Sequence, residues 1–279
     1  MTIVKNKIYT GSNNRLSVYD LFYNKNKIQK KVLIFCHGFK GFKDHGCFDL
    51  MAKWFAEKNF VFIKFNFSHN GGTIENPIDF PDLEAFSNNT YTKELYDLNV
   101  ILDELFAFKY INEQEIDLQN IALIGHSRGG GISILKAQQD ARISHLITLG
   151  AVSTLNRFPE GEKLKLWKKE GITYIENLRT HQQMPLKYDL YKNYIENKEI
   201  LDIKKSAENL NKPYLILHGM EDETVDFQEA IVLNSWCKTA TLFSLENANH
   251  AFGSSHPWEK EHLPVDFKKA LETIISFIS

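Results

Sequence analysis

The chain contains few cysteines, no long apolar run and almost no net charge. Its three cysteines, Cys36, Cys47 and Cys237, are odd in number and lack metal-ligand spacing. This favours reduced thiols in a cytosolic protein. No segment approaches the ~20 apolar residues of a membrane-spanning helix, and the first residues lack the apolar core of a signal peptide. We therefore expect a cytoplasmic protein with no membrane partner.

The charge balance and the missing motifs exclude further classes of protein. The 33 basic and 35 acidic residues give a formal net charge of -2, which argues against a nucleic-acid binder that depends on phosphate contacts. The sequence contains no HExxH motif, no clustered Cys/His spacing and no G-x-G-x-x-G. We therefore expect neither a metal nor a nucleotide cofactor.

What the sequence does contain is an alternation of apolar strands with helical segments. A continuous apolar run in each strand is typical of a mainly parallel sheet that helices cover on both faces. The clearest helix is 91–109, which has leucines along one face. The predicted strands are 3–9, 16–24, 32–36, 60–67, 121–124, 143–150, 213–218 and 241–245, and the other predicted helices are 48–58, 132–139 and 267–278.

One long segment interrupts this alternation. Between residues 151 and 211 we find no strand candidate, only helical fragments rich in aromatic and charged residues. The stretch is long for a simple connection, so we interpret it as a cap over the sheet edge, with ordinary crossover helices as the alternative. The expected domains are an α/β core of residues 1–151 and 212–279 and a cap insertion of residues 152–211.

A nucleophile motif lies at the end of the strand 121–124. The sequence Gly125-His126-Ser127-Arg128-Gly129 follows that strand and precedes a helical segment, which is the context of a G-x-S-x-G nucleophile elbow. The two glycines leave room for the tight, strained turn that raises the Ser127 hydroxyl above the sheet edge. Ser127 is therefore the predicted nucleophile.

A serine hydroxyl needs a base to activate it, and the base needs an orienting acid. The strand 213–218 is followed by a loop carrying Asp222, where sites in parallel sheets collect. We prefer Asp222 to the neighbouring acids Glu221, Glu223 and Asp226, because its offset from the strand end leaves one turn to direct the carboxylate back over the sheet. Its alternative role is that of a solvated turn residue.

The base is expected on the loop after the last strand. His250 follows the strand 241–245 and completes the order Ser, Asp, His. His256 is the second choice, and His262 lies still farther along the loop. A lone loop histidine is usually only solvated, so the assignment of His250 rests on its place in that order.

The loop that follows the strand 32–36 is expected to contribute to the oxyanion hole. The strand 32–36 ends at His37-Gly38 and continues into a glycine-containing loop. The backbone N–H groups of Phe39 and Arg128 are the predicted donors to the tetrahedral oxygen. We expect His37 to brace this loop by hydrogen bonding. The Arg128 side chain could bind an acidic substrate group, although a structural salt bridge is its commoner role.

Three further residues are candidates for the substrate pocket. His69 follows a strand and is expected at the rim of the site, while Trp167 and Met184 belong to the cap segment. The two cap residues could equally form a small core of the cap itself, which is the commoner role of such side chains.

Four segments, HGFKGFKD, GHSRGG, LHGMEDETV and NANHAFG, occur in this order. With these motifs the chain resembles the α/β-hydrolase superfamily over about residues 32–279, in the group of dienelactone-hydrolase-like proteins, cinnamoyl-type esterases and serine aminopeptidase-like hydrolases. The resemblance implies a mostly parallel eight-stranded sheet with a cap after the sixth strand. It also implies a Ser127–Asp222–His250 triad. The dienelactone hydrolases use a cysteine nucleophile, so Ser127 places this chain nearer the esterases.

The expected activity is that of a cofactor-independent serine hydrolase, a carboxylesterase acting on small acyl or aromatic esters. A thioesterase and a serine peptidase-like hydrolase remain open, because a triad alone does not choose the leaving group. From another class, a non-catalytic α/β-hydrolase that binds a small molecule through its cap also remains open. The sequence leaves monomer and homodimer undecided.

Overall fold

A mostly parallel eight-stranded sheet forms the centre of the molecule. The computed structural model describes residues 1–107 and 111–279. In the described chain the strands are β1 (Thr2–Thr10), β2 (Leu16–Tyr23), β3 (Lys30–Cys36), β4 (Val61–Phe65), β5 (Ile116–His126), β6 (Ile143–Leu149), β7 (Ile172–Glu176), β8 (Gln183–Lys187), β9 (Tyr214–Gly219) and β10 (Ala240–Leu245).

Helices occupy most of the connections between the strands. They are α1 (Phe48–Glu57), α2 (Leu83–Ser87), α3 (Tyr91–Phe106), α4 (Arg128–Gln139), α5 (Gly161–Glu170), α6 (Asp189–Glu196), α7 (Ile203–Glu208), α8 (Phe227–Trp236) and α9 (Val265–Ile278), with two short 3₁₀ turns, η1 (Ser12–Asn14) and η2 (Glu113–Glu115).

The strand order of the large sheet is β1-β2-β4-β3-β5-β6-β9-β10. Strands β1, β2 and β4 pair antiparallel, and every other pair in this sheet is parallel. The carboxyl ends of β5, β6 and β9 therefore open at the same edge, where sites in open parallel sheets form. The eight-stranded, mostly parallel sheet predicted from the sequence is confirmed.

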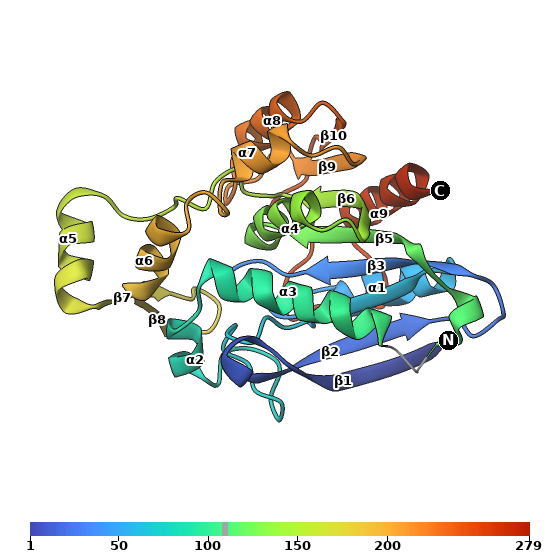
Figure 1. Cartoon of the computed structure of the whole chain (residues 1–279), viewed down its shortest axis with the longest axis horizontal. Helices are drawn as coiled ribbons and strands as arrows, with labels where there is room; N and C mark the ends of the chain where they lie inside the picture. Colours follow the sequence, from blue (N-terminus) through green and yellow to red (C-terminus); the bar gives the residue numbers. More distant parts are fainter. Residues whose placement is uncertain (108–110) are drawn as a thin grey trace.

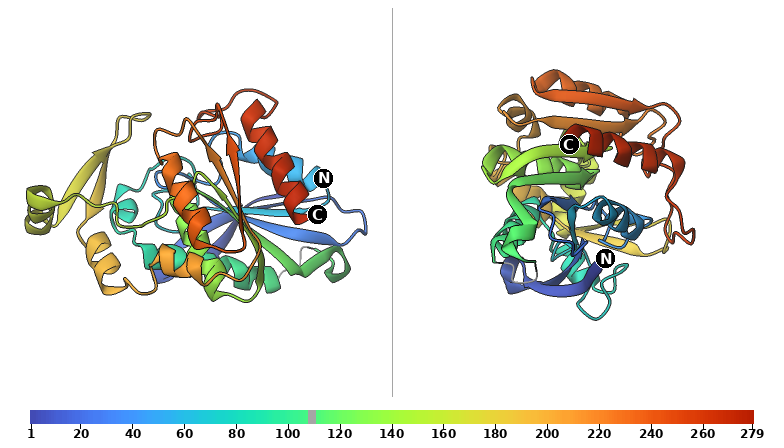
Figure 2. Two further views of the ribbon diagram at one scale, coloured as in Figure 1. Left: turned by 90° about the horizontal axis from the view of Figure 1, so that it is seen from above. Right: turned by 90° about the vertical axis from the view of Figure 1, so that its right-hand side faces the viewer.

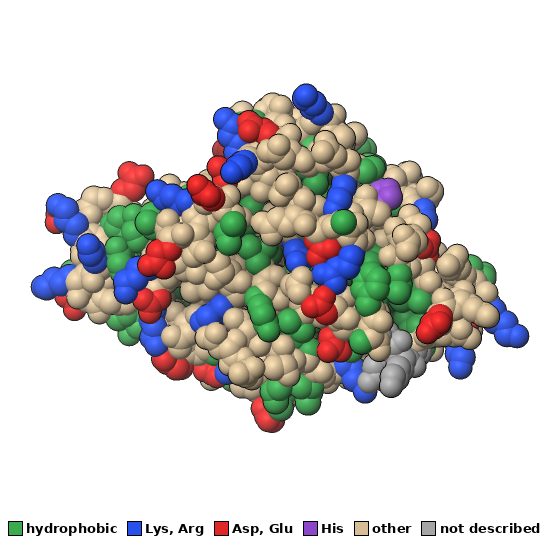
Figure 3. Space-filling model, viewed as in Figure 1, with side chains coloured by type: hydrophobic (Ala, Val, Ile, Leu, Met, Phe, Trp, Pro, Cys, Tyr) green, Lys and Arg blue, Asp and Glu red, His purple; other side chains and the backbone are tan. Residues whose placement is uncertain are grey.

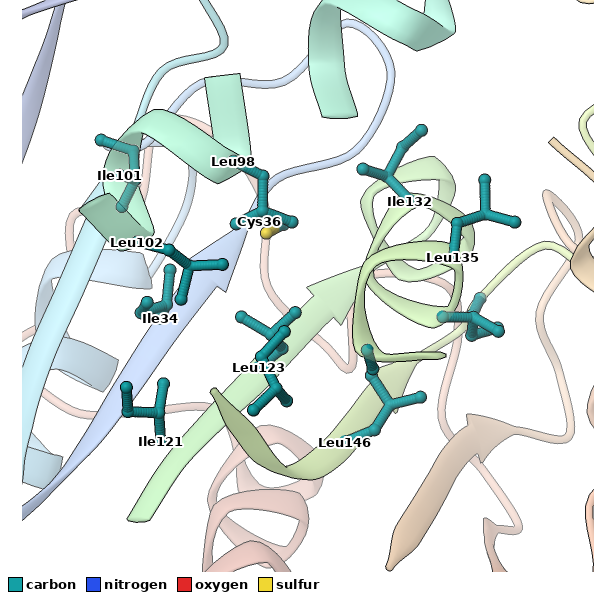
Figure 4. Close-up of a cluster of buried hydrophobic side chains, with 14 of the residues drawn as sticks. Ile34, Cys36, Leu98, Ile101, Leu102, Ile121, Leu123, Ile132, Leu135 and Leu146 are labelled. Atoms are coloured by element: carbon teal, nitrogen blue, oxygen red, sulfur yellow. The ribbon is translucent and has the colours of Figure 1, made fainter. Parts of the chain in front are cut away.

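The inner strands are apolar on both sides because helices cover both faces of the sheet (Figure 1). Along β3, Ile34 and Cys36 pack toward α3 and α4, whereas Leu33 and Phe35 pack toward α1 and α9. Figure 4 shows the first of these two layers, in which Leu98 of α3 lies near the β3 side chains. This two-sided burial explains why the strand segments read as continuous apolar runs.

The inserted segment between β6 and β9 contains strands that the sequence analysis did not predict. Strands β7 and β8 form a separate antiparallel sheet, which projects with α5 from one end of the molecule (Figure 2). Their sequences, ITYIE and QMPLK, are short and partly exposed, and the second contains a proline, so periodicity alone gives little signal. Helix α7, within the same insertion, packs on α4 and α8. The cap boundaries 152–211 stay a prediction.

The other predicted elements agree with the structure within a few residues. Helix α4 begins at Arg128, whereas the prediction began at 132, and α3, predicted over 91–109, ends at Phe106. The last two predicted positions, 108 and 109, lie outside the described residues. Strand β5 is longer than its predicted core 121–124, since it begins at Ile116 and continues to His126.

Candidate active site

Ser127 occupies a strained turn between β5 and α4. Its backbone has φ 55° and ψ -123°, a conformation that costs a non-glycine residue of order 1–3 kcal/mol. The turn is held by hydrogen bonds on both sides of the residue: its N–H donates to Leu149 O at 3.0 Å, and its carbonyl accepts from Gly130 N at 3.0 Å. A Cβ on Gly125 would lie 2.5 Å from Gly129 O. A Cβ on Gly129 would clash with His37 O. Both positions therefore require glycine, because the neighbouring backbone leaves no room for a side chain.

Asp222 and His250 meet beside this turn. His250 Nδ1 lies 2.7 Å from Asp222 Oδ2, which makes Nδ1 the donor and leaves Nε2 free to accept a proton. The Asp222 side chain is fully buried, whereas that of His250 is 19 % exposed. A Cβ on Gly150, directly after β6, would lie 3.1 Å from Asp222 Oδ2. The end of β6 therefore lies directly against the aspartate–histidine pair.

The surroundings of Asp222 favour its ionised form. Burial by itself would raise the pKa of this carboxyl, but hydrogen bonds from His218, His250 and the Val225 N–H together hold it well below the usual range. The Oδ1 atom accepts from Thr224 N at 2.9 Å and from Val225 N at 2.8 Å. These bonds fix the carboxylate, so that Oδ2 faces His250. The competing acid Asp226 caps α8 through Gln228 N.

The two predicted amide donors lie on either side of the Ser127 turn. Arg128 is the first residue of α4, and the loop carrying Phe39 crosses close to the serine, because a Cβ on Gly38 would lie 2.8 Å from Ser127 Cβ. Within the described chain, neither the Phe39 N–H nor the Arg128 N–H donates to another backbone or side-chain group. Both amides are available to a ligand oxygen. Their role as an oxyanion hole stays a prediction.

The Arg128 side chain forms the salt bridge that the sequence analysis named as its commoner role. Its Nη2 lies 2.6 Å from Glu94 Oε1 on α3, and its guanidinium stacks 4.2 Å from the centre of the Phe39 ring. Burial raises the pKa of Glu94, although Arg128 and Asn89 act against that rise. The side chain therefore ties α4, α3 and the Phe39 loop together, and each of the two amide donors is held in place.

A cavity of about 940 Å³ opens onto Ser127 and His250. Its walls are mainly apolar and come from both the core and the inserted segment. The apolar and aromatic side chains that line it include Phe39, Phe48, Tyr91, Val152, Leu155, Phe158, Leu166, Trp167, Ile172, Tyr174, Ile175, Leu186 and Leu190. Such a volume accommodates a drug-sized or larger ligand.

Of the three predicted pocket residues, Trp167 lines this cavity and the other two do not. Met184 is fully buried in a small cluster with Phe42 and its aromatic neighbours. His69 lines a separate polar hollow beside Arg15, and its Nδ1 lies 2.9 Å from Ser68 Oγ. The expectation that Met184 and His69 line the substrate pocket is therefore corrected. A sequence does not reveal which face of a short cap strand turns toward the site.

His256, the second candidate for the base, contacts a different loop. His256 Nδ1 accepts from Gly46 N at 2.9 Å, and its ring stacks on His45. His37 braces the loop after β3 as expected: Phe67 N donates to its Nε2 at 3.2 Å, and its Nδ1 lies 2.9 Å from Gly38 O.

Two histidines next to the site were missed by the sequence analysis. His126 Nε2 lies 2.9 Å from the carbonyl oxygen of His250, and the two rings are 4.6 Å apart. His218 Nε2 lies 2.8 Å from Val225 O and 3.3 Å from Asp222 Oδ2. Both residues lie at or next to the carboxyl end of a strand whose following residues include a predicted site residue. That position was the signal available in the sequence.

The buried histidines around the site make the stability of the protein depend on pH. Burial lowers the pKa of His37 to about 4 and that of His45 and His126 to about 3. In the unfolded chain these histidines are protonated near pH 6.5, whereas in the folded protein they stay neutral to a lower pH. The free energy of unfolding should therefore fall as the pH drops from 6.5 to 4, by about 3 kcal/mol for His37 alone. Urea unfolding at a series of pH values measures this loss.

Two glutamine variants test that assignment. His37→Gln should flatten the fall in stability between pH 6.5 and 4, because one buried proton-binding group is removed. His262→Gln changes an exposed histidine and should leave the slope unaltered. Equal slopes in the wild type and in His37→Gln would contradict the expectation.

Within the described residues, three carboxylates lie close enough together to hold a metal ion: Asp20, Asp44 and Asp49. Three lysines already pair with them. The ammonium groups of Lys5, Lys43 and Lys64 lie 2.9–3.0 Å from Asp20 Oδ2. The cluster thus forms a balanced ion network beneath β2 and β4, and its chemistry is that of a structural element.

In the view of Figure 3, basic and acidic side chains are interspersed. Among the helices of residues 1–107 and 111–279, none has both the length and the apolar character needed to cross a bilayer.

Known proteins with similar sequences or structures point to one superfamily. AB hydrolase superfamily protein YisY of Bacillus subtilis is 23 % identical over 250 residues, covering 79 % of this chain and 85 % of that protein. The protein of Mycoplasma genitalium named "Putative esterase/lipase 2" is 28 % identical over 124 residues, 44 % of this chain. The match spans only 38 % of the length of that mycoplasma protein.

Solved structures share the fold at lower identity. Est1E from Butyrivibrio proteoclasticus, whose structure contains bound ferulic acid, has a TM-score of 0.70 and 18 % identity, with 98 % of this chain and 99 % of that chain covered. The family model of the prolyl oligopeptidase family matches residues 47–263, which contain Ser127, Asp222 and His250. This chain has the α/β-hydrolase fold and belongs to the prolyl oligopeptidase family.

Proposed function

We propose that the protein is a serine esterase that cleaves carboxylic esters through an acyl-enzyme on Ser127. One arrangement carries the proposal: Ser127 and His250 line the same cavity, and His250 is hydrogen-bonded to the buried Asp222. A strained serine beside an oriented imidazole fits nucleophilic catalysis.

In the proposed reaction, Ser127 Oγ attacks the ester carbonyl carbon and its proton passes to His250 Nε2. The tetrahedral intermediate then expels the alcohol oxygen, which takes the proton from His250, and the acyl group remains on Ser127. Water repeats the sequence and releases the acid. Asp222 keeps the Nδ1 proton of His250 directed toward Oδ2, so that Nε2 faces the reacting groups.

The amides of Phe39 and Arg128 are the proposed donors to the negative oxygen of the intermediate. They are free of other acceptors in the described chain, and the glycine before Phe39 lies against the serine. One such donor contributes about 3 kcal/mol to transition-state stabilisation. No proton or cofactor has to be supplied at that position.

An ester is the preferred bond for two reasons. The cavity is largely apolar, which favours acyl or aromatic groups. The mycoplasma relative carries the name esterase/lipase, and Est1E binds ferulic acid, an aromatic acid. The family name makes peptide-bond cleavage the second candidate, because the same residues serve both reactions.

Two reagents test the proposal on the full chain. A fluorophosphonate probe should label the protein at Ser127, and p-nitrophenyl butyrate should be hydrolysed with a saturable rate. A peptide p-nitroanilide should be turned over at least a hundredfold more slowly than this ester. If the folded protein shows neither labelling nor hydrolysis, a catalytic role is rejected and a binding protein is favoured. A faster anilide would identify a peptidase.

A further inference from the structure

The charges around the cavity are unevenly distributed. Lys40, Arg128, Arg157 and Lys163 line it, against a single carboxylate, Glu170. Arg128 pairs with Glu94 and Arg157 pairs with Glu229, each at 2.6 Å. Neither glutamate lines the cavity. Lys163 and Glu170 belong to the exposed surface of α5. The net positive charge that remains close to the nucleophile is that of Lys40.

The Lys40 side chain is partly buried, and it has no carboxylate partner within the described residues. Among the described residues no Asp or Glu oxygen lies within 4.0 Å of it, and its one contact is the backbone carbonyl of Glu176, 3.3 Å away at the end of β7. Burial lowers the pKa of the lysine, as expected for a cation that loses water without gaining a counter-charge. A bound anion would remove that cost.

The position of Lys40 connects this charge to the reaction site. Lys40 directly follows Phe39, the proposed amide donor, so the two Cα atoms are about 3.8 Å apart. The backbone of Lys40 has φ 54°, a left-handed conformation that is uncommon for residues other than glycine. Lys40 lines the same cavity as Ser127 and His250, so the loop that carries the proposed amide donor also brings an ammonium group to this cavity.

We propose that this site selects esters whose apolar acyl chain carries a second, ionised acid group, which pairs with Lys40. The inference rests on the proposed esterase function and adds the substrate class. The aromatic and aliphatic walls hold the body of the acyl chain, and Lys40 binds its charged end. The half-ester of a dicarboxylic acid has this chemistry.

The test compares two esters of the same shape. The mono-p-nitrophenyl ester of adipic acid carries a terminal carboxylate, whereas its primary-amide analogue is neutral. After subtraction of spontaneous hydrolysis, the wild type should show a kcat/KM at least tenfold higher for the acid. The difference should lie mainly in KM, because the pair forms already in the bound substrate. It should shrink in 0.5 M NaCl.

Three variants connect this preference to Lys40. Lys40→Asn removes the charge while tolerating positive φ, and should reduce the acid-to-amide ratio to about one. Lys40→Arg should retain most of the ratio. Lys165→Asn, the matched control, removes an exposed lysine of α5 that pairs with Glu162 and should leave the ratio at its wild-type value.

Two results would overturn the inference while the esterase proposal stands. If the wild type is labelled by the fluorophosphonate and hydrolyses both esters equally, the cavity does not discriminate by charge. Lys40→Asn could instead lower kcat/KM for both esters by the same factor, which would make Lys40 only a tie between its loop and β7. If the wild type shows neither labelling nor hydrolysis, the esterase proposal itself is rejected.

Discussion

Ser127→Ala is expected to lower kcat for p-nitrophenyl butyrate at least a thousandfold and to abolish fluorophosphonate labelling. The change removes the Oγ atom that forms the acyl bond, whereas alanine keeps the Cβ and hence the same backbone requirement at φ 55°. Hydrolysis that remains would come from water acted on by His250 and the amide donors. Steady-state kinetics and intact-protein mass spectrometry give the two measurements.

Ser133→Ala is the matched control for this variant. Ser133 belongs to the same helix, α4, and its hydroxyl donates to Gly129 O at 2.7 Å, but it does not line the cavity. Its kcat should stay within a few-fold of the wild type. A Ser127→Ala protein that is folded by circular dichroism and retains a tenth or more of the activity would remove Ser127 as the nucleophile.

The sequence predicted the central sheet well because its inner strands are buried on both faces. In β3 and β5, successive side chains pack alternately into the two core layers, so the residues facing either side are apolar. A continuous apolar run of this kind is a clear signal for a buried strand. The positions of Ser127, Asp222 and His250 followed from the strands that precede them. Their proximity in space could be inferred only from the parallel topology.

The inserted segment was harder to predict, since its strands are short and half-exposed. Nothing in the sequence MPL distinguishes the buried Met184 from the cavity-lining Leu186. The neighbours of Lys40 are also set by tertiary structure, because its contact, Glu176, lies 136 residues away in the chain. Side-chain direction and charge pairing across the cavity therefore had to come from coordinates.

Asp222→Asn should lower kcat about ten-thousandfold while the fold persists. An asparagine oxygen in the Oδ1 position can still accept from Thr224 N and Val225 N, so the loop keeps its shape. Its NH₂ group would then face His250 Nδ1, which favours the tautomer that carries the proton on Nε2, and the base is lost. Asp226→Asn, the same change at the α8 cap, should cost less than tenfold in kcat. If the two variants lost activity equally, Asp222 would have no special role, and the orienting acid would have to be sought elsewhere in the loop after β9.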